Sequence, residues 1–171
     1  MKIWVLGHKG LPDGKMRSLL ELPSYLINKY QWDVVYSHVS IVDPRPNDAK
    51  KIMIWEAWWD GVRYCAYTED RVADAFYIDV PDEKMPLLVA WLDQQVGKSY
   101  DYFGLVGFLW RSNKYQNPSK WFCSELVATS FKVARCQLYN WNIIQPHQIT
   151  PALMVAALNG PFTIQEFQGQ V

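Results

Sequence analysis

Cys123 opens an apolar segment that has the periodicity of a helix. The segment reads Trp121-Phe122-Cys123-Ser124-Glu125-Leu126-Val127-Ala128. The unpaired N–H groups and the positive dipole end of a helix N-terminus favour a thiolate over a thiol, and the thiolate is the nucleophilic form of cysteine. We therefore predict that Cys123 is a nucleophile, in a hydrolase or an acyltransferase.

A cysteine nucleophile needs a base, and the base needs a group that orients it. His38 lies in a segment rich in β-branched residues, and Glu56 lies in the next such segment. If the two strands pair about Asn47, position 38 falls opposite position 56, with Cβ atoms about 4.5 to 5.5 Å apart. Glu56 falls on the same face of the expected strand as apolar residues, so we expect its carboxylate to be buried and to need a partner. We predict that it orients His38, whose second ring nitrogen then faces Cys123.

Each of these residues also has a purely structural interpretation. Cys123 can be a small core residue of a helix, and His38 a hydrogen-bonded residue of a strand. Glu56 can pair with Lys50 or Arg63 on a half-solvated sheet. In combination, however, the three residues reproduce a nucleophile, a base and an orienting acid, a set that is recognised by roles and not by sequence order.

The segments around these residues predict an α+β fold in which an antiparallel sheet packs against the nucleophile-bearing helix. Runs of β-branched and aromatic residues bounded by turn signals predict the strands, and apolar side chains at helical spacing predict the helices. The strands are expected at 2–6, 33–42, 52–58, 62–67 and 75–80. Helices are expected from 82 to Gly97, from Cys123 to about Ala134, and over 152–158 after a Thr150-Pro151 cap, with a mainly helical or irregular stretch at 17–30 and a loop with a short helix at 100–108.

Length, charge balance and cysteine count indicate which classes of protein fit the sequence and which do not. The 171 residues suit a single domain over 1–171, which can bury a core without disulfide or metal staples. Lys and Arg number 17, as do Asp and Glu, so no overall field recruits nucleic acid. The 3 cysteines are too few for a disulfide framework. Residues 1–8 are too short for a signal peptide or a transmembrane segment, which predicts a cytoplasmic or virion-associated protein.

The sequence resembles the YiiX-like cysteine peptidases, which have a circularly permuted papain fold and belong to the wider NlpC-type hydrolase superfamily. In that group a histidine-bearing strand comes first, an acidic residue follows, and the nucleophile comes late. The matching segments keep this order over nearly the whole chain: 37–42 (Ser-His-Val-Ser-Ile-Val), 55–57 (Trp-Glu-Ala) with Gly61-Val62, 97–101 (Gly-Lys-Ser-Tyr-Asp), 122–127 (Phe-Cys-Ser-Glu-Leu-Val) and 149–151 (Ile-Thr-Pro). The chain departs from its relatives at residues 5–10, where they have a compact Gly-Asp strand.

The resemblance implies a papain-like, thiol-protease type of hydrolase, in which Cys123 is the nucleophile, His38 the general base and then acid, and Glu56 the orienting residue. It implies a thioacyl-enzyme intermediate and an amide substrate, often a cell-wall (peptidoglycan) peptide. Some permuted relatives cleave or transfer lipid acyl groups, so a lipid substrate stays open. A non-catalytic alternative is a structural or virion-associated module that binds such fragments in the groove, together with an unidentified assembly partner.

Aromatic residues make up 15% of the chain, with 9 Trp, and several lie close in sequence to the predicted catalytic residues. We expect some of these rings to wall a substrate groove. The side chains predicted to contact substrate are Tyr36, Trp58, Tyr102, Trp121 and His147. The Cys123 backbone N–H is the predicted oxyanion donor, with Tyr36 and Tyr102 as possible further donors. His8 and His147 lie in expected loops without metal-ligand spacing, so neither a metal nor another cofactor is predicted.

Overall fold

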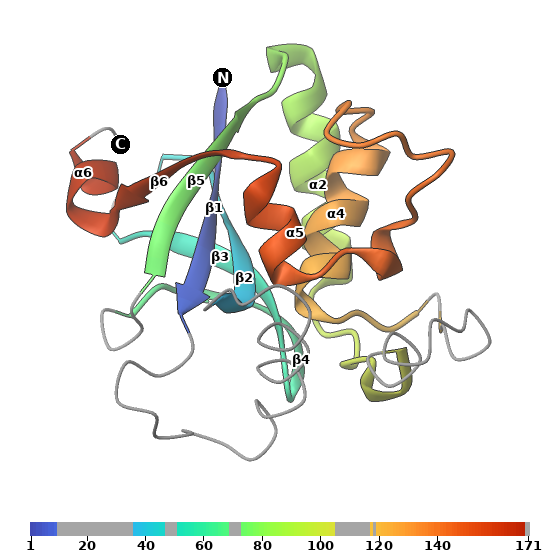
Figure 1. Ribbon diagram of the computed structural model, residues 1–171. Coiled ribbons are helices and arrows are strands. Elements are labelled where there is room, and N and C mark those ends of the chain that lie inside the picture. Colours follow the sequence, from blue (N-terminus) through green and yellow to red (C-terminus); the bar gives the residue numbers. More distant parts are fainter. Residues whose placement is uncertain (10–35, 47–50, 69–72, 105–116, 118, 170–171) are drawn as a thin grey trace.

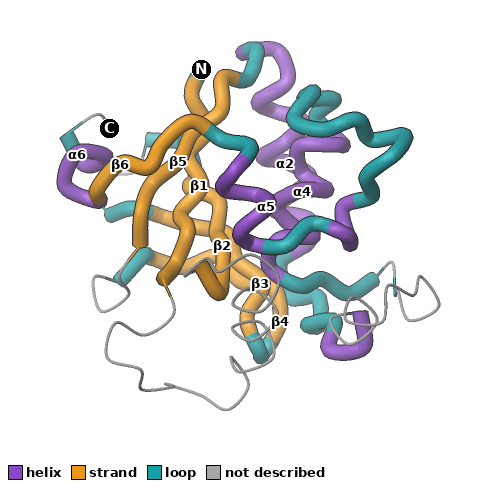
Figure 2. Tube along the Cα trace, viewed as in Figure 1, coloured by secondary structure: helices purple, strands orange, loops and turns teal. Residues whose placement is uncertain are grey.

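The chain folds as a six-stranded, open antiparallel sheet with helices packed against it, which makes it an α+β protein (Figure 1). The strand order is β4-β3-β2-β1-β5-β6. The computed structural model describes residues 1–9, 36–46, 51–68, 73–104, 117 and 119–169. Helices α2, α4 and α5 lie together on one side of the sheet, and α6 lies by itself next to β6 (Figure 2).

The strands alternate in direction, and the helices follow mainly in the second half of the chain. The strands are β1 (Lys2–Lys9), β2 (Tyr36–Val42), β3 (Met53–Trp58), β4 (Gly61–Ala66), β5 (Ala73–Asp79) and β6 (Asn159–Thr163). The helices are α2 (Met85–Gln95), α4 (Cys123–Val133), α5 (Pro151–Ala156) and α6 (Ile164–Gln168), with short 3₁₀ turns η2 (Asp82–Lys84) and η4 (Pro146–Gln148).

Both faces of the sheet are buried along β1, β2 and β3, where successive side chains point to opposite faces. On one face, Ile41 and Trp55 pack in a cluster with Leu126 of α4. On the other face, Leu6 belongs to a second cluster with Phe167 of α6. Each of these side chains is fully buried, and burying one contributes about 1.5–3 kcal/mol. The first cluster holds α4 against the sheet, and the second holds α6 against the opposite face.

The start of α4 is fixed by an extended segment. Phe122 has extended backbone angles, and the helix begins at Cys123. The Asp101 N–H donates to the Trp121 carbonyl at 3.1 Å, and the Trp121 N–H donates to the Ser99 carbonyl at 3.2 Å. Residues 99–101 therefore run beside the residues that precede the cysteine, which fixes where the helix begins.

The predicted helix at Cys123 is confirmed. It ends at Val133, one residue before the expected end, and the expected stripe is buried. That stripe consists of Leu126, Val127, Ser130, Phe131 and Ala134. The predicted antiparallel sheet is confirmed as well, and β1 extends to Lys9, three residues beyond the expected end.

The C-terminal region differs from the prediction. Helix α5 ends at Ala156, and Gly160 lies inside β6 instead of ending a helix. A Cβ on Gly160 would lie 2.8 Å from the Phe76 ring and 3.0 Å from the Ala75 carbonyl oxygen. Glycine therefore lets this edge strand approach β5 closely. Neither β6 nor α6 was predicted, because a Gly-Pro pair in a polar segment indicates a turn.

The expected stretch at 17–30 and most of the expected loop at 100–108 lie outside the described residues. The described helices include none with both the length and the apolar character needed to cross a bilayer.

Candidate active site

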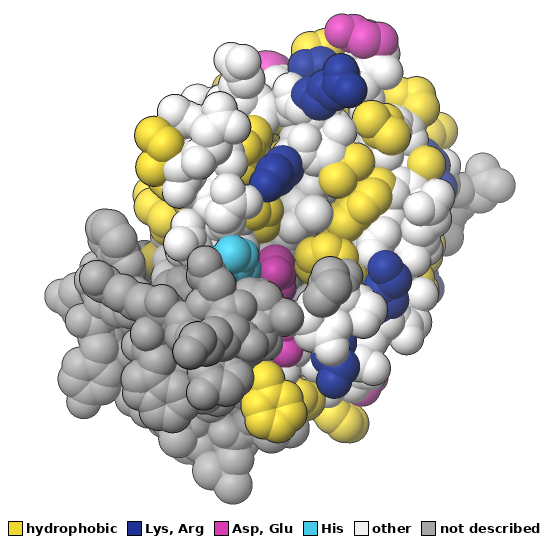
Figure 3. All heavy atoms as spheres, turned by 90° about the vertical axis from the view of Figure 1, so that its right-hand side faces the viewer, with side chains coloured by type: hydrophobic (Ala, Val, Ile, Leu, Met, Phe, Trp, Pro, Cys, Tyr) yellow, Lys and Arg dark blue, Asp and Glu magenta, His cyan; other side chains and the backbone are white. Residues whose placement is uncertain are grey.

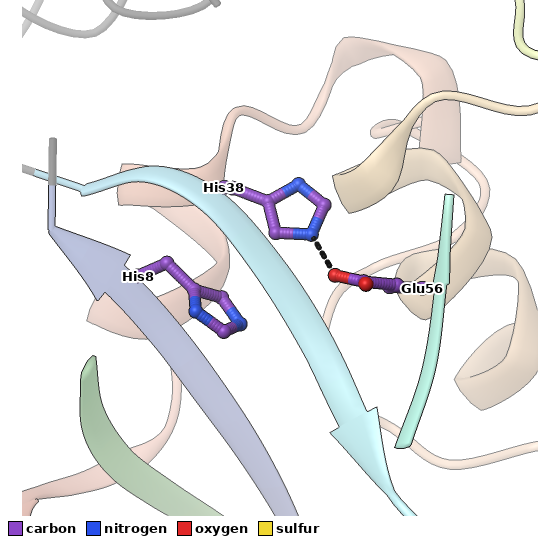
Figure 4. A group of neighbouring side chains, drawn as sticks. All are labelled: His8, His38 and Glu56. Atoms are coloured by element: carbon purple, nitrogen blue, oxygen red, sulfur yellow. Dashed lines mark hydrogen bonds and ion pairs between the residues drawn. The ribbon is translucent and has the colours of Figure 1, made fainter. Parts of the chain in front are cut away.

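His38 and Glu56 are joined by a buried hydrogen bond. His38 Nε2 lies 2.8 Å from Glu56 Oε2, and Figure 4 shows the two side chains pointing toward each other. The Glu56 side chain is fully buried, and His38 is 8% exposed. A carboxylate buried in this way holds the Nε2 proton and leaves Nδ1 to face a second partner. The structure thus brings together two of the three predicted catalytic residues.

The predicted register of the two strands is wrong by two residues. Pairing about Asn47 would place position 38 opposite position 56, whereas Ile41 pairs with Trp55 and Val42 pairs with Ile54. Continued along the strands, this register puts Ser40 opposite Glu56. His38 is then a diagonal neighbour of Glu56 on the same face, at a spacing that long side chains can bridge. The observed pairs are centred one residue after Asn47, so the assumed centre did not give the register.

Glu56 has a second partner on the next strand. Arg63 of β4 is its cross-strand neighbour. The Arg63 Nε and Nη2 atoms donate to Glu56 Oε1 at 2.8 and 2.6 Å. Glu56 therefore bonds both His38 and Arg63, one through each carboxylate oxygen. The guanidinium offsets the cost of burying the carboxylate and keeps it ionised. Lys50, the other partner considered, lies outside the described residues.

Cys123 acts directly on His38 from the start of α4. The sulfur belongs to a buried residue, 3% exposed. Burial by itself lowers the pKa of His38, but the charge and hydrogen bond of Cys123, followed by those of Glu56, outweigh it and raise the pKa to about 9. The protonated, imidazolium form of His38 is therefore favoured near neutral pH beside Cys123.

The first turn of α4 adds to this arrangement. The first N–H groups of an α-helix have no partner within the helix, and they carry its positive dipole end. Ser124, next to the cysteine, donates its hydroxyl proton to the Ile149 carbonyl and so ties the turn to the segment before α5. The Cys123 side chain is thereby presented from a fixed turn beside the His38 ring.

His8 is a residue of this site that the sequence analysis missed. It was expected in a loop, but it lies in β1, directly opposite His38. The two rings are 5.0 Å apart between centroids, and His8 Nε2 lies 2.8 Å from Ser40 Oγ. Trp4 and Leu6 precede it at two-residue intervals on the same face. Extending the alternation by one step identifies His8 as a buried strand residue.

A metal ion is one conceivable occupant of this cluster. Ligand atoms of His8, His38 and Glu56 lie within 4.8 Å of one another. They already take part in a proton network, in which His8 bonds Ser40, His38 bonds Glu56, and Glu56 bonds Arg63. A dication would displace the proton between His38 and Glu56 and would lie beside a guanidinium. The arrangement suits proton transfer better than metal ligation.

Among the residues predicted to contact substrate, Trp58 lies against the His38 ring. The two rings meet edge to face with centroids 4.7 Å apart. The Arg63 guanidinium lies 5.3 Å from the Trp58 ring. Trp58 thus forms a wall of the site and restricts the position of His38.

The two tyrosines considered as oxyanion donors have other partners. Tyr36 donates its hydroxyl proton to Asp74, and burial, followed by the Asp74 hydrogen bond and charge, raises the pKa of Tyr36 above its usual range. Tyr102 donates to the Trp59 carbonyl oxygen at 2.5 Å. Both hydroxyl protons are thus donated to other acceptors, and neither hydroxyl serves as an oxyanion donor in this conformation. The first backbone N–H groups of α4, which have no partner within the helix, can take that role.

The last two predicted contact residues lie elsewhere. Trp121 is buried, and its indole N–H donates to Gln95 of α2 at 3.1 Å, so it belongs to the helical core. His147 lies half-buried in η4, where burial, with a further contribution from Lys132, lowers the pKa of its ring. The structure therefore gives both residues a place in the helical layer.

Comparisons with known proteins add no assignment. The chain matches no protein-family model, and a search of curated proteins found no relative with significant similarity. The function of the chain is therefore inferred from the arrangement of His38, Glu56 and Cys123.

Proposed function

We propose that this protein is a cysteine hydrolase that cleaves an amide bond, in a peptide or an isopeptide, through a thioacyl-enzyme intermediate. Cys123 is the nucleophile, His38 the base and acid, and Glu56 the orienting group, on a circularly permuted papain-like (NlpC-type) fold. The observation that carries the proposal is the buried His38–Glu56 hydrogen bond of 2.8 Å, with Cys123 acting on the same ring.

The chemistry follows from the partners of the imidazole ring. The Cys123 thiolate attacks the carbonyl carbon, and the resulting oxyanion is stabilised by N–H groups at the start of α4. The C–N bond then breaks as His38 transfers a proton to the leaving amine. Water attacks the thioester while His38 takes its proton, and the S–C bond breaks to restore the thiolate. Glu56 holds the ring throughout and stays ionised beside Arg63.

The first experiment measures whether Cys123 is activated. Iodoacetamide alkylation is followed at each cysteine by peptide mass spectrometry, near neutral pH, in the wild type and in His38→Ala. Cys136 is the internal control, because burial raises the pKa of its thiol. We expect Cys123 to react much faster than Cys136 and to slow about 10-fold or more in His38→Ala. A Cys123 rate that does not change in the variant contradicts the proposal.

The second experiment identifies the scissile bond. Peptidoglycan fragments, model peptides, phospholipids and acyl thioesters are incubated with the wild type, with Cys123→Ala as the blank. We expect release of new amino groups from amide substrates and accumulation of a thioacyl adduct of the wild type by intact-protein mass spectrometry. Turnover of lipid substrates alone would contradict the amide assignment while leaving the cysteine mechanism in place.

A lipid acyl substrate is the second candidate, and exposed aromatic residues favour it. Trp59, Tyr102 and Phe103 are 53%, 42% and 69% exposed, and Tyr102 and Trp59 are hydrogen-bonded to each other. Amphipathic rings of this kind suit an interface between apolar and aqueous phases. On the face shown in Figure 3, the described hydrophobic and charged side chains are interspersed, without a broad area of one charge. That distribution gives nucleic acid no recognisable footprint there.

A further inference from the structure

Glu125 is a buried carboxyl group in the first turn of α4 that the proposed mechanism does not use. It lies two residues after Cys123 and is 8% exposed. Its Oε2 atom is completely buried, and no described residue gives it a hydrogen-bond partner. Buried polar atoms are nearly always paired, so an unpaired carboxylate oxygen needs a physical explanation.

A second buried carboxyl group faces it from the neighbouring segment. Asp101 is 1% exposed, and its two oxygens accept the N–H groups of Gly104 at 2.8 Å and Asn117 at 3.3 Å. Those bonds satisfy a carboxylate. A second negative charge close by, with no cation beside it among the described residues, would be disfavoured.

The surroundings of Glu125 favour its uncharged form. Burial, with the charge of Asp101 adding to it, raises the pKa of Glu125 to about 8, while the Phe122 N–H acts in the opposite direction. Glu125 is therefore mainly a neutral acid at pH 7.

The location connects this pair to the nucleophile. The Asp101 N–H donates to the Trp121 carbonyl, and the Phe122 N–H that acts on Glu125 belongs to the residue just before Cys123. Both carboxyl groups thus adjoin the backbone that sets the direction of the Cys123 side chain. We propose that Glu125 is a positioning residue of the Cys123 site, whose uncharged carboxyl group holds the first turn of α4 against the Asp101 segment.

Ionisation of Glu125 has two expected consequences. It places a like charge next to Asp101, which pushes the first turn away from residues 99–104. It also places a negative charge two residues from the Cys123 thiolate, which disfavours the reactive form. This role rests on the proposed function, because its readout is the reactivity of Cys123. The described groups that face Glu125 and bear on this titration are Asp101 and the Phe122 N–H.

The test compares two substitutions of Glu125. Glu125→Gln keeps an uncharged carbonyl of the same shape, and Glu125→Met keeps the length without any oxygen. Alkylation of Cys123 is measured from pH 6 to 10, with thermal unfolding to verify folding. We expect Glu125→Gln to react within about twofold of the wild type at pH 7, and Glu125→Met about 10-fold or more slowly, since misplaced groups at reactive sites cost up to about 100-fold.

The pH profiles provide the decisive readout. We expect the wild-type rate to fall below the rate of Glu125→Gln as the pH rises through about 8, and Asp101→Asn to move that point to lower pH. The proposal is overturned if Glu125→Gln and Glu125→Met both match the wild type at every pH, or if Glu125→Gln retains the inflection near pH 8. Failure of the hydrolase proposal is separate, because it appears as an unchanged alkylation rate in His38→Ala.

Discussion

Two buried carboxyl groups near Cys123, those of Glu56 and Glu125, lie in opposite electrostatic surroundings. On the side of the sheet, Glu56 is fully buried but bonded to His38 and Arg63, so it is kept ionised. On the side of residues 99–104, Glu125 is buried beside Asp101, and burial, followed by the charge of Asp101, raises its pKa to about 8. The same side-chain type therefore lies between a histidine and an arginine in one place and beside another acid in the other, and these partners decide which protonation state is favoured.

The largest expected effect comes from removing members of the dyad. Cys123→Ala should abolish turnover, and His38→Ala should lower kcat by about 10³-fold or more, as the loss of catalytic triad members does. Thermal unfolding verifies that each variant is folded under the assay conditions. The measurement is single-turnover and steady-state hydrolysis of whichever substrate the panel identifies. A His38→Ala enzyme with more than about a tenth of wild-type kcat would show that the ring is not the base.

Glu56→Gln tests the carboxylate that is bonded to His38 and Arg63. The amide still bonds the ring but no longer supplies a charge, so His38 should lose part of its raised pKa. We expect the alkaline limit of activity, set near pH 9 by loss of the imidazolium proton, to move to lower pH, with kcat reduced about 10- to 100-fold. Arg63 also loses its ionic partner, and because it is partly exposed we expect a cost of only about 1–2 kcal/mol. An unchanged alkaline limit would contradict the orienting role.

Glu125→Gln tests the second carboxyl group through the pH dependence of the unfolding free energy. The folded-state pKa of Glu125 lies above its ordinary value of 4.5, so the folded protein binds more protons than the unfolded chain between about pH 4.5 and 8. Unfolding free energy must therefore fall as pH rises through this window. We expect Glu125→Gln to remove a few kcal/mol of that decline. Urea denaturation at pH 5 and pH 8.5 measures it, and an identical decline in the two proteins would exclude Glu125 as its source.

A change outside both regions serves as the smallest effect and the control. The Thr150 hydroxyl accepts the Leu153 N–H at 2.9 Å and caps α5. Thr150→Ala should lower the unfolding free energy by about 1 kcal/mol without altering Cys123 alkylation or its pH profile. An altered profile would mean that general loosening of the helical layer, and not the two carboxyl groups, sets the reactivity.

Local sequence patterns predicted the helices and strands better than the way in which these elements pair and pack. The apolar spacing after Cys123 gave the helix and its buried stripe, because that signal lies within one segment. The partnership of His38 and Glu56 was correctly expected, although its register was wrong, since a long connection does not determine pairing as a tight turn does. The environment of Glu125 is invisible in sequence, because Asp101 approaches it through tertiary packing. His8 was missed because the first strand continues past a glycine.

The central claim is that Cys123 and His38 form an activated pair, and the most direct test is the titration of the His38 ring. Its pKa can be measured by NMR of selectively labelled histidine in the wild type and in Cys123→Ala. The account predicts a wild-type pKa of about 9 and a clearly lower value in the variant, where burial is no longer outweighed by the cysteine. The same pKa in both proteins would contradict it.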